Sequence, residues 1–155
     1  MPDPIILESK IKPDVIFGVN VKVVLPVNLY GCKIGDNSFI GPFVEIQKDV
    51  EIGNNCKVQS HTFICELVTI GSNCFIGHSV VFINDLFSEG KPANGNKALW
   101  KKTKIGDNVS IGSNATILPV EICDNVVIGA GAVVTKNISV PGFYVGNPAK
   151  LLKTI

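Results

Sequence analysis

The feature that most constrains this chain is an apolar residue at every sixth position. The unbroken run is Ile34, Ile40, Ile46, Ile52, Val58, Ile64, Ile70, Ile76 and Phe82. The same spacing returns at Ile105, Ile111 and Ile117, and again at Ile122, Ile128 and Val134. A helix with one buried face needs apolar residues about every 3.6 positions, and a half-buried strand needs them at every second position. A period of six therefore indicates a repeated unit that is neither a simple helix nor a flat strand.

A second small or aliphatic residue follows four positions after most of these apolar residues. These second positions are Ser38, Val44, Val50, Cys56, Thr62, Val68, Cys74, Val80, Val109, Ala115, Val126 and Ala132. Two inward positions in every six residues describe a short strand and a corner, and such units bury their apolar side only by stacking into a parallel β-solenoid. Glycine often follows the first position, and we expect it at the corners because it accepts backbone angles that a β-carbon would forbid. On this pattern, Cys56 and Cys74 are core thiols.

The repeat predicts one domain over residues 1–155 with a single long interruption. A looser version of the spacing begins at Ile11, and the end of the chain leaves the repeat through Pro141 and Pro148 to form a short helix or another cap. Between about residues 84 and 104 the chain is rich in Gly, Asn and Lys. A loop of this length in a regular domain is usually functional or disordered. We expect it to reach over a neighbouring subunit or to form a wall of a binding site.

Composition excludes several classes of partner. Hydrophobic residues make up 46% of the chain and charged residues 17%, which indicates a folded protein. The net charge is +1 and arginine is absent, so neither nucleic acid nor an anionic membrane is expected, and phosphate recognition must use lysines, backbone N–H groups or hydroxyls. The start lacks a signal-peptide pattern, and five cysteines without a CxxC pair suggest neither a disulfide scaffold nor a zinc site. We therefore expect a cytoplasmic protein.

The phrases "IGDNVSIGSNATILP", "VVIGAGAVVTKNI" and "VGNPAK" resemble those of the hexapeptide-repeat acyltransferases. The resemblance implies an all-β, left-handed parallel β-helix of triangular coils, a homotrimer with sites between subunits, and acetyl-CoA as co-substrate without a metal. With "QSHTFICE" and "FINDLF" included, the chain is most similar to the branch that N-acetylates 3-amino sugars on dTDP or UDP for bacterial surface polysaccharides such as O-antigen.

If three hexads make one coil, residues eighteen apart lie on the same face, about 4.8 Å apart. This places Glu66 beneath Asn84, Ser60 beneath His78, and His61 beneath Ser79. Asn84 is expected around the next corner from His78. We expect these polar side chains to cluster near a single edge of the solenoid and to form a site there.

N-acetylation requires a thioester carbonyl held against an uncharged amine, a donor for the developing oxyanion and a route for the leaving proton. His78, His61 and Glu66 are the candidate bases, although structural histidines would explain the first two. The resemblance implies instead that Asn84 positions the amine while the departing thiolate takes the proton. Asp85 is expected to bind the acceptor or to cap the loop, and Trp100 with Lys101 to bind the nucleotide unless Trp100 fills a subunit interface.

The resemblance also implies where acetyl-CoA binds. It points to the late coils, where small residues would let the pantetheine pass close to the backbone, and to the regions matching "TKNI" and "GNPAK". The cofactor-binding candidates are Ser113, Ala115, Ala130, Ala132, Lys136, Asn147 and Lys150. The lysines have an equally simple explanation as exposed surface residues.

Three alternatives stay open at this point. One keeps the reaction class but acetylates a hydroxyl of a sugar, serine or antibiotic with a histidine base. Another is a zinc-dependent carbonic anhydrase of the gamma type, which needs three histidines where this chain has two. The third is a structural trimer without a ligand, for which the long interruption has no obvious use.

Overall fold

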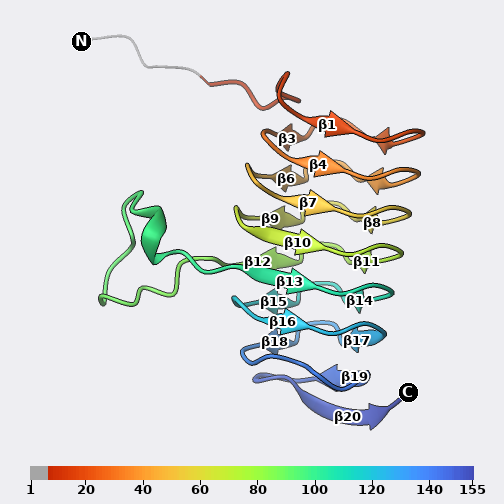
Figure 1. The fold of residues 1–155 in the computed structure, drawn as a ribbon, viewed down its shortest axis with the longest axis vertical. Helices are drawn as coiled ribbons and strands as arrows, with labels where there is room; N and C mark the ends of the chain where they lie inside the picture. The colour runs from red at the N-terminus through yellow and green to blue at the C-terminus, as the bar shows by residue number, and fades with distance from the viewer. Residues whose placement is uncertain (1–6) are drawn as a thin grey trace.

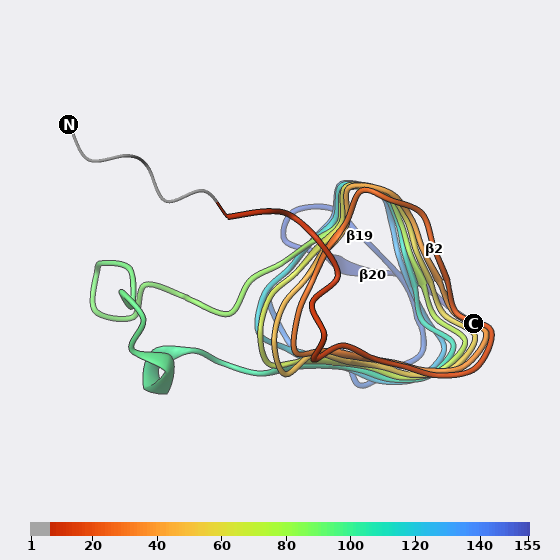
Figure 2. The same ribbon diagram turned by 90° about the horizontal axis from the view of Figure 1, so that it is seen from above.

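A computed structural model describes residues 7–155 and shows a left-handed parallel β-helix built almost entirely of short strands (Figure 1). Seen along its axis, the helix has a triangular cross-section (Figure 2). The all-β solenoid predicted from the six-residue period is therefore confirmed. Residues 1–6, which belong to the expected domain and to the start read as free of a signal peptide, lie outside the described residues.

Each side of the triangle is one sheet. The first sheet contains β1 (Ile16–Phe17), β4 (Lys33–Ile34), β7 (Glu51–Ile52), β10 (Val68–Ile70), β13 (Thr103–Ile105) and β16 (Glu121–Ile122). The second contains β2 (Lys22–Val23), β5 (Phe39–Ile40), β8 (Lys57–Val58), β11 (Phe75–Ile76), β14 (Ser110–Ile111), β17 (Val126–Ile128), β19 (Gly142–Val145) and β20 (Lys150–Thr154). The third contains β3 (Asn28–Leu29), β6 (Glu45–Ile46), β9 (Phe63–Ile64), β12 (Val81–Phe82), β15 (Thr116–Ile117) and β18 (Val133–Val134).

The strand register follows the sequence repeat. Ile34 pairs with Ile52 and Ile52 with Ile70, so one circuit takes 18 residues. Where the sequence has a five-residue step the circuit shortens to 17 residues, as between Ile105 and Ile122. Stacking in this register places identical or similar side chains above one another throughout the helix.

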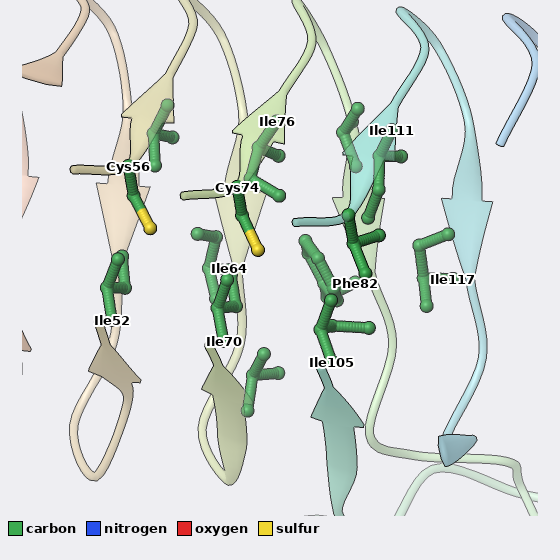
Figure 3. Packing of buried hydrophobic residues seen from close by; sticks show 14 of the residues in the cluster. Ile52, Cys56, Ile64, Ile70, Cys74, Ile76, Phe82, Ile105, Ile111 and Ile117 are labelled. Carbon is green, nitrogen blue, oxygen red and sulfur yellow. The ribbon is translucent and has the colours of Figure 1, made fainter. Parts of the chain in front are cut away.

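The interior is filled by the two predicted positions of each repeat. All the first-position residues from Leu29 to Val134 are at most 4% exposed, and the second-position residues, Cys56 and Cys74 included, are at most 2% exposed. Figure 3 shows these side chains in columns, with isoleucine following isoleucine from one coil to the next. Burial of each isoleucine contributes roughly 1.5–3 kcal/mol, so the columns supply most of the driving force for folding.

The glycines after the first position serve a purpose different from the one expected. None of Gly35, Gly53 and Gly71 has a positive φ; the left-handed conformation is taken two residues later, at Asn37, Asn55 and their equivalents. A β-carbon at Gly53 would lie 2.7 Å from the carbonyl carbon of Gly71 on the next coil. These glycines are therefore required by the close approach of successive coils. Asparagine is one of the few residues other than glycine that tolerate this left-handed conformation.

The C-terminal cap is a hairpin of strands, and the short helix considered as an alternative does not form. β19 joins the second sheet in parallel next to β17, and β20 then pairs with β19 in the antiparallel sense. This hairpin closes the lower end of the helix in Figure 1. At the other end the first strand is less covered, with Phe17 38% exposed.

The long interruption leaves the helix at the corner between β12 of the third sheet and β13 of the first. We refer to residues 83–102 as the arm. It projects sideways from the stack and carries one turn of 3-10 helix, η1 (Lys97–Leu99) (Figures 1 and 2). Within residues 7–155, no helix is both long and apolar enough to cross a membrane.

Candidate active site

A groove of about 580 Å³ lies between the third sheet and the base of the arm. Its lining comprises Gln47, Phe63, Cys65, Val81, Phe82, Ile83, Asn84, Asp85, Leu86, Phe87, Trp100 and Leu118. A larger cavity of about 770 Å³ runs along the second sheet, but its polar lining consists of exposed side chains, the half-buried Gln59 and Ser38, whose hydroxyl is bonded internally. The groove at the arm is the better candidate site because it is mainly apolar and holds a few fixed polar groups.

Asn84 is the most buried polar side chain of this groove, at 8% exposure. Its Nδ2 donates to the backbone oxygen of Glu66 at 3.2 Å, and the backbone oxygen of Asn84 accepts from the backbone N–H of Lys101 at 2.9 Å. Because a carbonyl oxygen can only accept, the nitrogen of the Asn84 amide must face Glu66. No donor among residues 7–155 is hydrogen-bonded to Oδ1, so Asn84 offers the groove an acceptor with a fixed orientation. The predicted stacking of Glu66 and Asn84 is confirmed.

The Glu66 carboxylate is paired with the arm. Oε2 lies 2.5 Å from Nζ of Lys97, and that ammonium group also lies 5.4 Å from the centre of the Trp100 ring. The Glu66 side chain is only 12% exposed. The backbone N–H of Glu66 donates to Oε1 of Gln47 at 3.3 Å, and its backbone oxygen accepts from Asn84. The side chains of Gln47 and Asn84 therefore fix the Glu66 backbone at both groups.

Asp85 organises the arm. One carboxylate oxygen accepts from the backbone N–H of Phe87 at 2.9 Å and the other from that of Ala93 at 2.8 Å. Of the two roles expected for Asp85, capping of the loop is therefore the one observed. Trp100 is half-buried in the groove wall, whereas the side chain of Lys101 is exposed.

The histidines lie at a different edge from Asn84. Nδ1 of His78 is 2.8 Å from Oγ of Ser60, which confirms the predicted stacking, and the ring of His61 stacks on Phe43 at 4.8 Å between centroids. Both histidines occupy the corner between the second and third sheets, because they follow β8 and β11. Asn84 follows β12 and sits at the corner between the third and first sheets. The expected step of one corner from His78 to Asn84 is confirmed, whereas the expectation of a single shared edge is wrong within one chain.

The predicted cofactor residues are scattered. Ala115 and Ala132 are fully buried and face the core, so their side chains are not on the surface where the pantetheine is expected to pass the backbone. Ser113 and Ala130 lie on the coils below His78 at the same corner, where the backbone N–H of Asn114 donates to the His78 carbonyl and that of Gly131 to the Ser113 carbonyl. Three further candidates are exposed: Lys136 beyond β18, and Asn147 and Lys150 at the turn of the C-terminal hairpin.

Two site residues were missed by sequence reasoning. Gln47 could have been found, since counting by eighteen puts it above Cys65 and Ile83 in one column of the groove. Lys97 carries no such signal because the arm has no repeat from which its position follows. In the part of the chain that the structure describes, no group of three His, Cys, Asp or Glu side chains is arranged to hold a metal ion.

Two family models match the chain. "Bacterial transferase hexapeptide (six repeats)" matches residues 31–66, and "Hexapeptide repeat of succinyl-transferase" matches residues 67–83 and 102–136. Together the two models, both of hexapeptide repeats, cover more than half of the chain. The second match is interrupted between residues 83 and 102, where the arm departs from the repeat.

Curated relatives include the bifunctional protein GlmU of Clostridium novyi, which is 41% identical over 107 residues, or 68% of this chain and 21% of the relative. GlmU of Clostridium perfringens is 37% identical over 135 residues, or 86% of this chain and 26% of the relative. The chain thus spans about a fifth to a quarter of the length of the curated relatives it matches.

Solved structures share the fold. AntD, an N-acyltransferase from Bacillus cereus in complex with dTDP and 3-hydroxybutyryl-CoA, is 23% identical with a TM-score of 0.77, covering 90% of this chain and 82% of that one. A mutant of perosamine N-acetyltransferase from Caulobacter crescentus, in complex with CoA and GDP-perosamine, is 19% identical with a TM-score of 0.64, covering 95% and 57%. At these identities the likeness establishes the fold alone.

Proposed function

The chain belongs to the hexapeptide-repeat transferase family, and from this premise we propose that it is an acetyl-CoA-dependent N-acetyltransferase acting on a 3-amino sugar linked to dTDP or UDP. The observation that carries the proposal is the free acceptor oxygen of Asn84 in a mainly apolar groove. An amine nitrogen is the donor that such an oxygen would position. The bound nucleotides and CoA of AntD and perosamine N-acetyltransferase support the choice of substrates.

The proposed reaction uses Asn84 for orientation. The acceptor amine donates one N–H to Oδ1 of Asn84, which directs its lone pair toward the thioester carbonyl. The N–C bond forms, the C–S bond then breaks, and the nitrogen loses a proton to the departing thiolate. Asn84 itself neither gains nor loses a proton. A fixed amide suits this role, because its Nδ2 is already held by the Glu66 carbonyl oxygen and the side chain need not reorganise.

In the proposed reaction Glu66 binds the protonated amine of the acceptor and removes its proton. A sugar amine is partly protonated near neutral pH and must lose one proton before it attacks. The Glu66 carboxylate lies one coil before Asn84 and is mostly shielded from solvent, so it can pair with the ammonium form and take its proton. Trp100 and the exposed lysines of the arm, Lys101 among them, would then face the nucleotide.

We propose that the chain assembles as a homotrimer. Apart from β1 at its end, the first sheet presents charged groups such as the pair Lys33–Glu51, at 2.7 Å. The second and third sheets instead expose Phe75 and Val81, at 40% and 37%. Contact of the second sheet of one copy with the third sheet of the next would cover these apolar side chains. The groove at Asn84 would then lie beside a neighbouring subunit, from which acetyl-CoA could approach it.

A thiol-release assay with acetyl-CoA and a panel of nucleotide-linked 3- and 4-amino sugars tests this function. Turnover is expected with at least one 3-amino sugar, and mass spectrometry should place the acetyl group on nitrogen. Absence of turnover with every amine, together with efficient acetylation of the matching 3-hydroxy sugars, would overturn the assignment.

One observation favours a second candidate, an O-acetyltransferase with a histidine base. The 2.8 Å contact with Ser60 fixes the His78 ring and leaves Nε2 of this exposed side chain available. A ring fixed in this way could remove a proton from a hydroxyl of a sugar, serine or antibiotic. The distance between this corner and the groove of Asn84 within one chain weighs against it.

A further inference from the structure

The ammonium group of Lys97 already occupies a cation-binding site beside Asn84. Nζ lies 2.5 Å from the Glu66 carboxylate and 5.4 Å from the centre of the Trp100 ring. A carboxylate binds an alkylammonium by charge and hydrogen bonding, and an aromatic face adds a cation–π attraction. Glu66 and Trp100 therefore provide the two groups that recognise a primary alkylammonium ion.

The two side chains of this ion pair differ in how firmly the protein holds them. The Glu66 side chain is 12% exposed, and its backbone is held from both sides by Asn84 and Gln47. The Lys97 side chain is 55% exposed and extends from the arm. Lys97 can therefore swing away into solvent, whereas Glu66 stays beside the groove.

We propose that Lys97 occupies the place of the acceptor's own ammonium group and that an acceptor bearing a primary ammonium displaces it from Glu66 on binding. The identity of that acceptor rests on the proposed function; the exchange itself does not. Both groups are R–NH₃⁺ and compete for one carboxylate and one ring. Lys97 is thus a specificity-determining residue, because a neutral hydroxyl acceptor has no charge with which to displace it.

Removal of Lys97 would change the affinity for the acceptor in opposite directions under the two possible roles of this residue. If Lys97 only anchored the arm, its removal would loosen the groove and weaken acceptor binding. If Lys97 competes with the acceptor, its removal frees Glu66 and strengthens binding. Asn84 stays in place in either case, since it is held by the backbone of Glu66 and not by the carboxylate.

Trp100 makes the exchange measurable without turnover, because it is the only tryptophan of the chain and forms one side of the site. Its fluorescence is titrated with ethylammonium chloride, using sodium chloride at equal ionic strength as the blank. The half-saturating concentration is expected to fall at least fivefold in Lys97→Met and in Lys97→Gln. Adding Glu66→Gln to Lys97→Met should abolish the response.

Lys91→Met is the matched control, because it removes an exposed lysine of the same arm that is not part of the site. It should titrate as the wild type does. Equal or weaker ethylammonium binding in both Lys97 variants would overturn the exchange.

Kinetics supply the second readout. With an amine substrate, Lys97→Met should lower the acceptor KM at least threefold and leave kcat within twofold, whereas a rise in KM would overturn the exchange. Wild-type protein that acetylates no amine would overturn the proposed function alone, because the ethylammonium titration still decides whether Lys97 and an alkylammonium compete. The two failures are therefore distinguishable.

Discussion

The side-chain amide of Asn84 donates a hydrogen bond at 3.2 Å to the backbone oxygen of Glu66, 18 residues earlier and one coil away. Because the acceptor is a backbone atom, replacing the side chain at position 66 leaves this bond in place. The orientation of the Asn84 amide and the charge of Glu66 can therefore be tested separately. The same register that stacks the core isoleucines sets this contact, so the site inherits its geometry from the repeat.

The stacked glycines give a test of the coil spacing. Gly53→Ala would place a β-carbon 2.7 Å from Gly71 of the next coil and from Oγ of Ser72. Relief of that overlap requires the coils to separate, and we expect a loss of about 2–3 kcal/mol in the free energy of unfolding. Chemical denaturation monitored by circular dichroism measures it.

Gly90→Ala is the control for this substitution. Gly90 lies in the arm at φ +72°, and a β-carbon there meets nothing within 4 Å. Only the conformational cost of the left-handed turn remains, about 1 kcal/mol. Equal losses for the two variants would show that close approach is not what requires glycine at position 53.

A substitution at Thr103 is expected to raise the free energy of unfolding, whereas the glycine substitutions lower it. It is 2% exposed, and its Oγ1 is buried without a hydrogen-bond partner among residues 7–155. Thr103→Val removes an unsatisfied polar atom at nearly constant shape, so we expect the free energy of unfolding to rise by about 1 kcal/mol.

Thr62→Val is the matched change at a satisfied threonine. The hydroxyl of Thr62 donates to the Gly77 carbonyl at 2.8 Å, and valine cannot replace that bond. This variant should lose about 1–2 kcal/mol by the same denaturation experiment. A stabilising Thr62→Val or a destabilising Thr103→Val contradicts the hydrogen-bond assignment.

The cysteines differ in reactivity. Burial raises the pKa of the Cys65 thiol to about 12 and that of Cys32 to about 11. At pH 8 both therefore stay protonated as well as covered, and Cys56 and Cys74 are equally inaccessible. Only Cys123 is partly exposed, so a thiol-specific reagent should modify one cysteine quickly in native protein and all five in denaturant. Rapid labelling of Cys56 or Cys74 in the native state would contradict the solenoid core.

The repeat made the fold and part of the site predictable. A six-residue period fixes which side chains face inward, and a circuit of eighteen residues places Glu66 at Asn84 and Ser60 at His78. The same count places Asn84, six residues after His78, one corner further round the triangle, so it argues against a single shared edge for the two residues. The count fails for Lys97, since nothing in a sequence of Gly, Asn and Lys determines the path of the arm.

His78 separates the two candidate reactions. Because His78 lies at the other edge of the third sheet from Asn84, His78→Ala is expected to keep more than a third of the wild-type kcat/KM toward an amino sugar. Its pH–rate profile should match that of the wild type. Loss of activity toward a hydroxyl acceptor beyond a hundredfold in His78→Ala, with Asn84→Ala tolerated, would instead favour hydroxyl acetylation with a histidine base.

The most direct measurement compares wild-type protein with Asn84→Ala and Asn84→Asp in steady-state acetylation of a nucleotide-linked 3-amino sugar. Alanine removes the acceptor oxygen, and aspartate keeps an acceptor but cannot donate to the Glu66 carbonyl oxygen. We predict that kcat/KM falls roughly a hundredfold for alanine and less for aspartate, as expected for the loss of one positioning contact, with melting temperatures that confirm folded protein. Wild-type activity in a folded Asn84→Ala variant would contradict the account.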